Sequence, residues 1–130
     1  MILGIDPGTR KCGIAIVERL GAPPEALEIV PLPAFPDRLA ELAATFGIEL
    51  AAIGRGTNAA QIVAAVERQG LPHALVDERE TSLLARARYF ADHPPRGWRR
   101  WVPRGMLLPE RPIDDYAALL IAERYLTLLE

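Results

Sequence analysis

Residues 1–17 read MILGIDPGTRKCGIAIV, and this stretch decides how the fold begins. Residues 2–5 and 13–17 are short apolar runs rich in β-branched side chains, and the Gly, Thr, Arg and Lys between them favour a hairpin of two strands. The Pro-Gly pair after Asp6 stops the first strand, because proline lacks the N–H that a sheet needs and glycine favours a turn. Asp6 is therefore predicted to lie at a strand end, beside a turn near residues 8–11.

The remaining sequence alternates strand-like and helix-like patterns. Apolar residues recur at helical spacing in some segments, while shorter continuous apolar runs indicate strands. We predict strands at residues 27–32, 50–54 and 73–76, and helices at 36–46, 58–69, 81–90 and 113–128. In the helix that follows the last strand, Leu83, Leu84 and Ala87 are expected to face the core.

The order of these elements resembles the ribonuclease H-like arrangement. A meander of three strands followed by two right-handed crossovers builds the mixed five-stranded sheet of an α/β protein, with helices on both faces. At 130 residues, half of them hydrophobic, the chain has the size of one domain over residues 1–130. In this arrangement the first and fourth strands are neighbours, so acids at strand ends can meet an acid from the last helix.

Three acids stand beside a turn where a strand or helix begins or ends: Asp6, Glu78 and Asp114. If they converge, their oxygens suit Mg²⁺ or Mn²⁺, because hard cations prefer oxygen ligands. Two such ions roughly 3.5 to 4 Å apart activate water and clamp the leaving oxygen in phosphodiester cleavage. The sequence contains no His/Cys cluster for zinc. Each acid also has an ordinary interpretation as a turn or cap residue, and Asp77 and Asp115 compete with their neighbours as ligands.

The positive charge of the chain is concentrated in one segment. The net charge is −2, but residues 79–111 carry eight arginines against three acids, and residues 96–104 hold four arginines and both tryptophans. Arginines pair with phosphates and tryptophans stack on unpaired bases, so this segment predicts contact with nucleic acid. The predicted nucleic-acid-binding residues are Arg86, Trp98, Arg99, Arg100, Trp101 and Arg104, with Thr9, Arg10 and Lys11 of the first turn as a phosphate cradle. Arg88 is expected to add charge beside Arg86. The alternative places the tryptophans in the core and the arginines in solvent.

Composition excludes several other classes. The single cysteine, Cys12, cannot form an internal disulfide, and no charged leader with an apolar stretch precedes the first strand. The longest apolar stretch, residues 116–122, is too short to cross a bilayer. We therefore expect a cytoplasmic protein that is not inserted in a membrane. The sequence leaves open whether the protein forms a homodimer.

Three motifs, in order along the chain, resemble the RuvX/YqgF family. They are GIDPGTR at residues 4–10 with GIA at 13–15, DERETS at 77–82, and ID at 113–114 with AA at 117–118 and ERYL at 123–126. This family belongs to the RuvC-like branch of the ribonuclease H-like superfamily. The resemblance implies a nuclease that uses Mg²⁺ or Mn²⁺ on structured nucleic acid, in maturation of the 16S ribosomal RNA precursor or in resolution of Holliday-junction DNA. The family's three acids fall on Asp6, Glu78 and Asp114.

One segment departs from the family pattern and raises two alternatives. After the fourth predicted strand the family usually shows Gly-Leu-Pro, whereas residues 54–58 read GRGTN, closer to the related domain of Tex-type transcription factors. A catalytically silent nucleic-acid-binding module is therefore the first alternative. Residues 54–59 also fit the G-x-G-x-x-A dinucleotide fingerprint, with Asp77 about twenty residues on. This second alternative leaves the strand-end acids and the Trp/Arg segment without a role.

Overall fold

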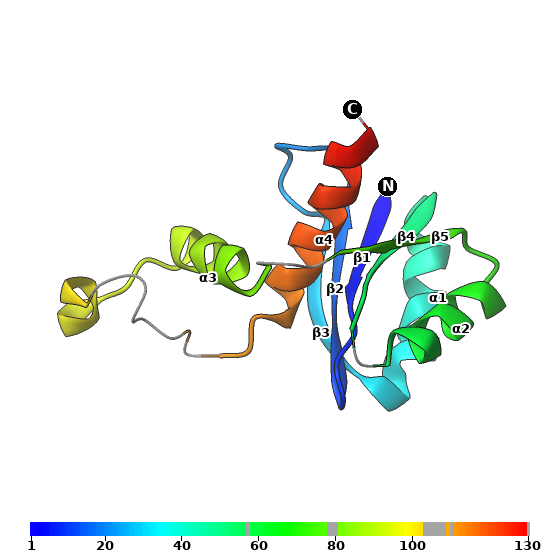
Figure 1. Ribbon diagram of the computed structural model, residues 1–130, viewed down its shortest axis with the longest axis horizontal. Helices are drawn as coiled ribbons and strands as arrows, with labels where there is room; N and C mark the ends of the chain where they lie inside the picture. The colour runs from blue at the N-terminus through cyan, green and yellow to red at the C-terminus, as the bar shows by residue number, and fades with distance from the viewer. Residues whose placement is uncertain (57, 78–80, 103–108, 110, 130) are drawn as a thin grey trace.

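A sheet of five strands forms the centre of the protein (Figure 1). The computed structural model describes residues 1–56, 58–77, 81–102, 109 and 111–129, and of residues 81–83 and 98 it describes the backbone. The strands are β1 (Ile2–Asp6), β2 (Lys11–Val17), β3 (Ala26–Pro31), β4 (Leu50–Gly54) and β5 (His73–Val76). Their order across the sheet is β3-β2-β1-β4-β5. The first three strands are antiparallel, and β4 and β5 run parallel to β1, so the sheet is mixed as predicted.

Helices cover both faces of the sheet (Figure 1). On one face lie α1 (Phe35–Thr45), which follows the 3-10 turn η1 (Leu32–Ala34), and α2 (Ala59–Arg68), while α4 (Asp114–Leu129) lies on the other face. The remaining helix, α3 (Thr81–Asp92), packs against α4, and together with the 3-10 turn η2 (Gly97–Trp101) it projects away from the sheet. The predicted α/β architecture is confirmed. No helix in the described part of the chain is long and apolar enough to cross a membrane.

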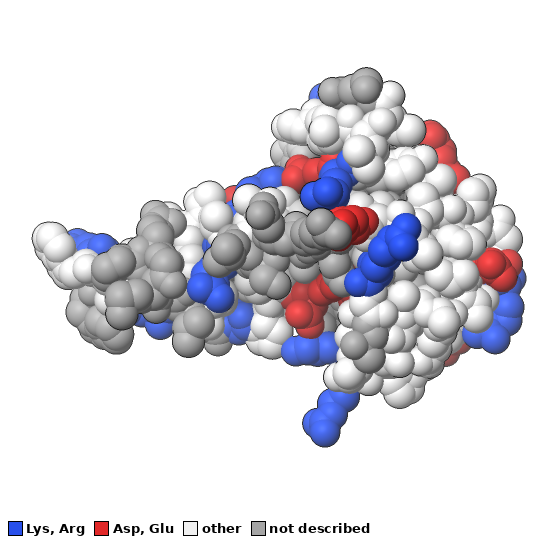
Figure 2. Space-filling view, in the orientation of Figure 1, with Lys and Arg blue, Asp and Glu red and all other residues white. Residues whose placement is uncertain are grey.

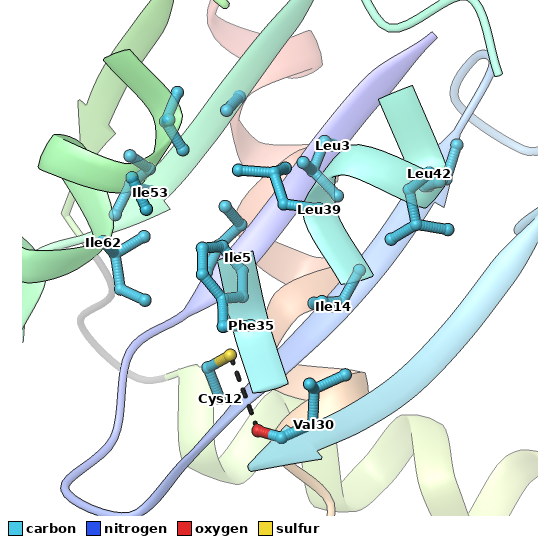
Figure 3. Close-up of a cluster of buried hydrophobic side chains, with 14 residues drawn as sticks. Leu3, Ile5, Cys12, Ile14, Val30, Phe35, Leu39, Leu42, Ile53 and Ile62 are labelled. Atoms are coloured by element: carbon cyan, nitrogen blue, oxygen red, sulfur yellow. Dashed lines mark hydrogen bonds between the residues drawn. The ribbon is translucent and has the colours of Figure 1, made fainter. Parts of the chain in front are cut away.

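The face of the sheet under α1 and α2 carries a core of large aliphatic side chains. Side chains alternate between the two faces of a strand, so Leu3 and Ile5 of β1 point to the same side. Figure 3 shows them beside Ile14 of β2, with Phe35 and Leu39 of α1 packed over the strands. All five side chains are fully buried, and their burial holds the end of β1 in a fixed position.

On the opposite face, glycines let the backbone of α4 lie directly on the strands. A Cβ atom on Gly4 would collide with the carbonyl oxygen of Ala118, and a Cβ atom on Gly13 would collide with the carbonyl oxygen of Asp114. Gly13 is also the cross-strand partner of Asp6 in the hairpin of β1 and β2. The close contact at Gly13 therefore places the first turn of α4 beside the end of β1.

The buried face of α3 differs from the predicted one. Leu84 is 51% exposed and Ala87 is exposed, whereas Ala85 and Tyr89 are buried. The side chain of Leu83 lies outside the described part of the structure. The reason is that α3 packs mainly on α4, so the stripe formed by residues 85 and 89, four positions apart, is the one that is covered.

Candidate active site

Asp6 and Asp114 line the same pocket, although they come from opposite ends of the chain. Asp6 is the last residue of β1, and Asp114 is the first residue of α4. The pocket has a volume of about 290 Å³, and its wall also includes Arg86 of α3 and Arg111, which precedes α4. The structure thus brings together the first and the last of the three predicted acids, with two cationic side chains beside them.

Of the two adjacent acids at the start of α4, the pocket includes Asp114 and not Asp115. Asp115 is only 5% exposed, and its two carboxylate oxygens each accept a hydrogen bond of 3.3 Å from the Arg111 guanidinium. It also accepts one from the backbone N–H of Tyr116 at 3.0 Å. Asp115 is therefore a structural partner of Arg111, and the geometry favours Asp114 as the acid that is available to a ligand.

A lysine lies beside the acids. The Nζ atom of Lys11 is 3.7 Å from Oδ2 of Asp114. The side chains of Lys11 and Asp114 are 43% and 34% exposed. An ion pair that is open to water contributes little to stability. Lys11 can therefore exchange this partner for another at low cost, as a phosphate-binding residue must.

Cys12 is buried and does not line the described wall of this pocket. Its side chain is fully buried, and its thiol donates to the carbonyl oxygen of Val30 at 3.7 Å (Figure 3). Burial, and then the negative charges of Asp6 and Asp114, raise the pKa of the Cys12 thiol from 9.0 to about 12. Without a bound cation the thiol is therefore protonated at neutral pH.

The third predicted acid, Glu78, lies outside the described residues. The parallel strands β1, β4 and β5 place their carboxyl ends at one edge of the sheet, and β5 ends at Val76, two residues before Glu78 in the sequence. Within the described parts of the chain, no group of three or more His, Cys, Asp or Glu side chains is close enough to hold a metal ion. The described acids of the pocket are thus Asp6 and Asp114.

The turn between β1 and β2 is hydrogen-bonded to the loop after β4. The side chain of Asn58 donates to the carbonyl oxygen of Gly8 at 2.8 Å, and Asn58 itself adopts a left-handed conformation with φ of 66°. Thr9 and Arg10, two residues of the predicted phosphate cradle, follow Gly8 in the chain and are exposed. The sequence motifs did not indicate this role of Asn58. Asparagine tolerates a left-handed backbone better than most residues with a side chain, so an asparagine between a strand and a helix could have indicated this turn.

The same loop does not belong to a dinucleotide-binding fold. Such folds are built from parallel βαβ units, with the fingerprint after the first strand. Here residues 54–59 follow the fourth strand, after an antiparallel meander. The loop lies within the parallel unit β4-α2-β5 but not at the first strand of the sheet, so the fold does not favour the dinucleotide alternative, which stays a prediction.

The described Trp/Arg residues of η2 lie away from the acid pocket. Figure 1 shows η2 at the outer end of the projection formed with α3, and Figure 2 shows Lys and Arg side chains along that projection. Trp101 is 78% exposed, with the Arg100 guanidinium 5.4 Å from the centre of its ring, and Arg99 is half-buried. Trp101 is thus not a core residue. The side chain of Trp98 and the whole of Arg104 lie outside the described part of the chain.

The two arginines of α3 have different surroundings. Arg86 lines the pocket with Asp6 and Asp114. Arg88, which was expected to add charge beside it, donates to both carboxylate oxygens of Glu123 in α4, at 2.7 and 3.3 Å. These hydrogen bonds raise the pKa of Arg88 and neutralise its charge locally. Arg88 therefore joins the two helices, and Arg86 is the arginine of α3 that faces the candidate site.

Arg111 is a further residue of the site that the sequence analysis missed. Its guanidinium lies 5.3 Å from the ring centre of Tyr89 and 5.7 Å from that of Tyr116, in addition to its contacts with Asp115. It also donates to the carbonyl oxygen of Pro112 at 2.7 Å. These contacts join α3 to the start of α4, so Arg111 holds the segment that carries Asp114. The spacing of four residues between Arg111 and Asp115 could have indicated this ion pair in the sequence.

The fold is shared with RuvC. A structure of Thermus thermophilus RuvC matches with a TM-score of 0.56 and 20% sequence identity, over 94% of this chain and 90% of that chain. A structure of T. thermophilus RuvC in complex with Holliday junction substrate matches with the same TM-score and coverage at 18% identity. No protein-family model and no curated protein sequence matches the chain. The likeness confirms the predicted ribonuclease H-like fold.

Proposed function

We propose that this protein is a divalent-metal-dependent nuclease that cleaves structured nucleic acid, as the resemblance of its motifs to the RuvX/YqgF family implies. One observation carries the proposal: Asp6 and Asp114 line one pocket together with two arginines. The fold supports it, because a RuvC structure with this fold is in complex with Holliday junction substrate. The pocket thus combines carboxylates that could bind a metal ion with guanidinium groups that could bind a phosphate.

The donor atoms of the pocket suit Mg²⁺ or Mn²⁺. The described ligands would be the carboxylate oxygens of Asp6 and Asp114, and Glu78 is proposed as the third acid. Oxygen ligands favour hard cations, and neither the buried thiol of Cys12 nor a histidine is part of the pocket wall. A divalent cation held there would supply positive charge at the scissile phosphate and lower the pKa of an attacking water.

The chain itself supplies groups that bind and orient the substrate. Arg86 reaches the pocket from α3 and is proposed to bind a phosphate oxygen next to the scissile bond. Lys11 lies beside Asp114 and is proposed to bind a second phosphate when the acids are occupied. Thr9 and Arg10 are exposed on the adjoining turn and extend this cradle along the backbone of the substrate.

The proposed substrates are the precursor of 16S ribosomal RNA and branched DNA of the Holliday-junction type. Both contain unpaired or distorted segments next to duplex. The exposed ring of Trp101 and the guanidinium stacked on it support a preference for unpaired bases, because aromatic side chains of binding proteins stack on them. Figure 1 shows η2 at the outer end of the projection, whereas α4, which carries Asp114, lies against the sheet, so bases stacked at η2 would be separate from those beside the cleaved bond.

The decisive experiment is cleavage of labelled precursor ribosomal RNA and of a four-way DNA junction, with Mn²⁺ and with EDTA. We expect cleavage of at least one substrate with Mn²⁺, none with EDTA, and none by Asp6→Asn, which removes a charge at nearly constant volume. Asp37→Asn is the matched control, because Asp37 is exposed in the first turn of α1, on the other face of the sheet. Activity of Asp6→Asn within a few-fold of the wild type would contradict the proposed site.

A second candidate function is a catalytically silent nucleic-acid-binding module, similar to the domain of Tex-type proteins. The observation that favours it is the GRGTN segment at residues 54–58, whose Asn58 holds the turn at Gly8. The same experiment separates the two functions. Binding of either substrate without cleavage, at any of several Mn²⁺ and Mg²⁺ concentrations, would select the silent module.

A further inference from the structure

A second cavity lies at the C-terminal end of α3, away from the acid pocket. Its volume is about 300 Å³, and its wall includes Tyr89 and Asp92 of α3 and, after the end of this helix, His93, Arg96 and Arg99. None of these five residues lines the pocket that contains Asp6 and Asp114. The cavity therefore combines aromatic rings, a carboxylate and two cations at a place that the proposed cleavage chemistry does not use.

Aromatic rings form a stacked platform in this cavity. The rings of Tyr89 and His93 are stacked, with 4.6 Å between their centres and 18° between their planes. Tyr89 is buried and packs edge-on against Phe90 and Tyr116, whereas His93 is exposed. The stack thus ends in an imidazole ring that is open to a further planar group.

The polar atoms around the platform are already oriented. Nδ1 of His93 lies 3.2 Å from the carbonyl oxygen of Tyr89, and because a carbonyl oxygen only accepts, Nδ1 is the donor. Nε2 of the neutral ring is then left as an acceptor. Asp92 accepts a hydrogen bond of 2.8 Å from the hydroxyl of Tyr116 in α4, which fixes its carboxylate at the cavity wall. The cavity is thus preformed and joined to the helix that carries Asp114.

We propose that this cavity binds one unpaired nucleotide of a nucleic-acid strand, with its base stacked on His93 and its phosphate facing Arg96 and Arg99. That the ligand is part of a nucleic-acid strand rests on the proposed function. The volume lies at the lower end of the range for small-molecule sites, roughly 300 to 1,000 Å³, so it suits one nucleotide and not a base pair. Splayed-out bases are commonly held by stacking and by hydrogen bonds to their edges.

The chain offers an internal control for a direct test, because it contains two histidines, His73 and His93. The imidazole Hε1 signals of both can be followed by proton NMR while 5′-AMP is added, and His93→Ala assigns them. Stacking of the base should move the His93 signal upfield by its ring current and leave the His73 signal, from β5, in place. Inorganic phosphate at the same concentration should give no such upfield shift. Equal shifts with phosphate, or no shift with 5′-AMP, would overturn the proposal.

Affinity for an unpaired oligonucleotide supplies the second measurement. His93→Ala should weaken binding at least about five-fold, the lower end of what base stacking contributes by alanine substitution, while His93→Phe should retain most of it. His73→Ala is the matched control and should bind as the wild type does. Equal affinity of the wild type and His93→Ala would overturn the proposal, as would an oligonucleotide that fails to displace 5′-AMP.

These measurements need neither a metal nor cleavage, so they separate the two proposals. An upfield shift of His93 without cleavage of any substrate would leave the cavity standing and contradict the nuclease. Cleavage without the shift would leave the nuclease standing and contradict the cavity.

Discussion

Two adjacent acids at the start of α4, Asp114 and Asp115, have different surroundings in the candidate site. Asp114 lines the pocket with Asp6, while its neighbour Asp115 is buried under the guanidinium of Arg111. The two side chains leave consecutive positions of a helix in different directions, so one meets the end of β1 and the other meets the loop before α4. Their substitution should therefore have different consequences.

We expect Asp114→Asn to abolish cleavage. The free energy of unfolding should change by less than about 0.5 kcal/mol, as it does for most substitutions at the protein surface. Asp115→Asn should instead lower the free energy of unfolding by roughly 1 to 3 kcal/mol, because it removes the charge of a buried acceptor that receives hydrogen bonds from Arg111 and from the backbone N–H of Tyr116. Urea denaturation of both variants, beside the junction-cleavage assay, checks this. The reverse pattern would assign the site to Asp115.

Cys12 should make the stability of the protein depend on alkaline pH. Its pKa in the folded protein is raised from 9.0 to about 12, so the stability linked to the protonated thiol is present below pH 9 and is lost as the pH rises toward 12. Between pH 8 and 10 this loss should be roughly 1 kcal/mol. Urea denaturation at both pH values should show it in the wild type and not in Cys12→Ala. An equal pH dependence of the two proteins would contradict the assignment.

At the scale of the elements, the contact between α4 and the hairpin determines the geometry of the site. Gly13 on β2 has no side chain, and the carbonyl oxygen of Asp114 occupies the place where one would be. The hairpin sets the position of Asp6, because Asp6 and Gly13 are cross-strand partners. One contact between a strand and a helix end therefore controls how the two acids face each other.

Gly13→Ala should push the start of α4 away from the sheet. We expect a loss of roughly 1 to 3 kcal/mol in the free energy of unfolding, the usual cost of overpacking, and a loss of cleavage larger than the loss of folded protein. Gly47→Ala is the matched control, because no atom lies within 4 Å of a Cβ placed on Gly47. If the two variants were equally stable and active, α4 would not depend on this contact.

In the whole molecule, positive charge also gathers away from the acid pocket, in addition to Arg86 and Arg111 in the pocket wall. Arginines gather on the projection of α3 and η2 (Figures 1 and 2), while the body of the protein carries most of the acids. A strand that reaches from the projection to the pocket would contact phosphate-binding groups at both ends. This arrangement gives a low net charge together with a local basic surface, which is why the net charge of −2 does not argue against nucleic acid.

Arg99→Ala with Arg100→Ala should weaken binding of the four-way junction and reduce its salt dependence. Each lost phosphate contact should lower the slope of log affinity against log salt concentration by about one unit. Titrations at several salt concentrations measure this slope. Arg68→Ala is the matched control, because Arg68 is exposed on α2, on the other face of the sheet. An unchanged slope in the double variant would mean that these arginines are only solvated.

Local sequence patterns are sufficient to predict the elements and the place of the first acid. The strands at residues 50–54 and 73–76 agree with the structure in every residue, because continuous apolar runs between turn residues carry their own signal. Asp6 lies at the end of β1 because proline and glycine follow it. These features depend on neighbours in the chain, and a local pattern is enough to predict them.

Which side chains come into contact depends on the packing of the whole fold. The buried face of α3, the pairing of Arg111 with Asp115, and the tie from Asn58 to Gly8 join segments whose contacts depend on how helices pack on the sheet and on each other. The cavity around His93 likewise exists because α3 docks on α4 through Tyr116. Contacts of this kind are set by shape and packing in three dimensions, and several arrangements satisfy the same local pattern until one of them is chosen by the whole fold.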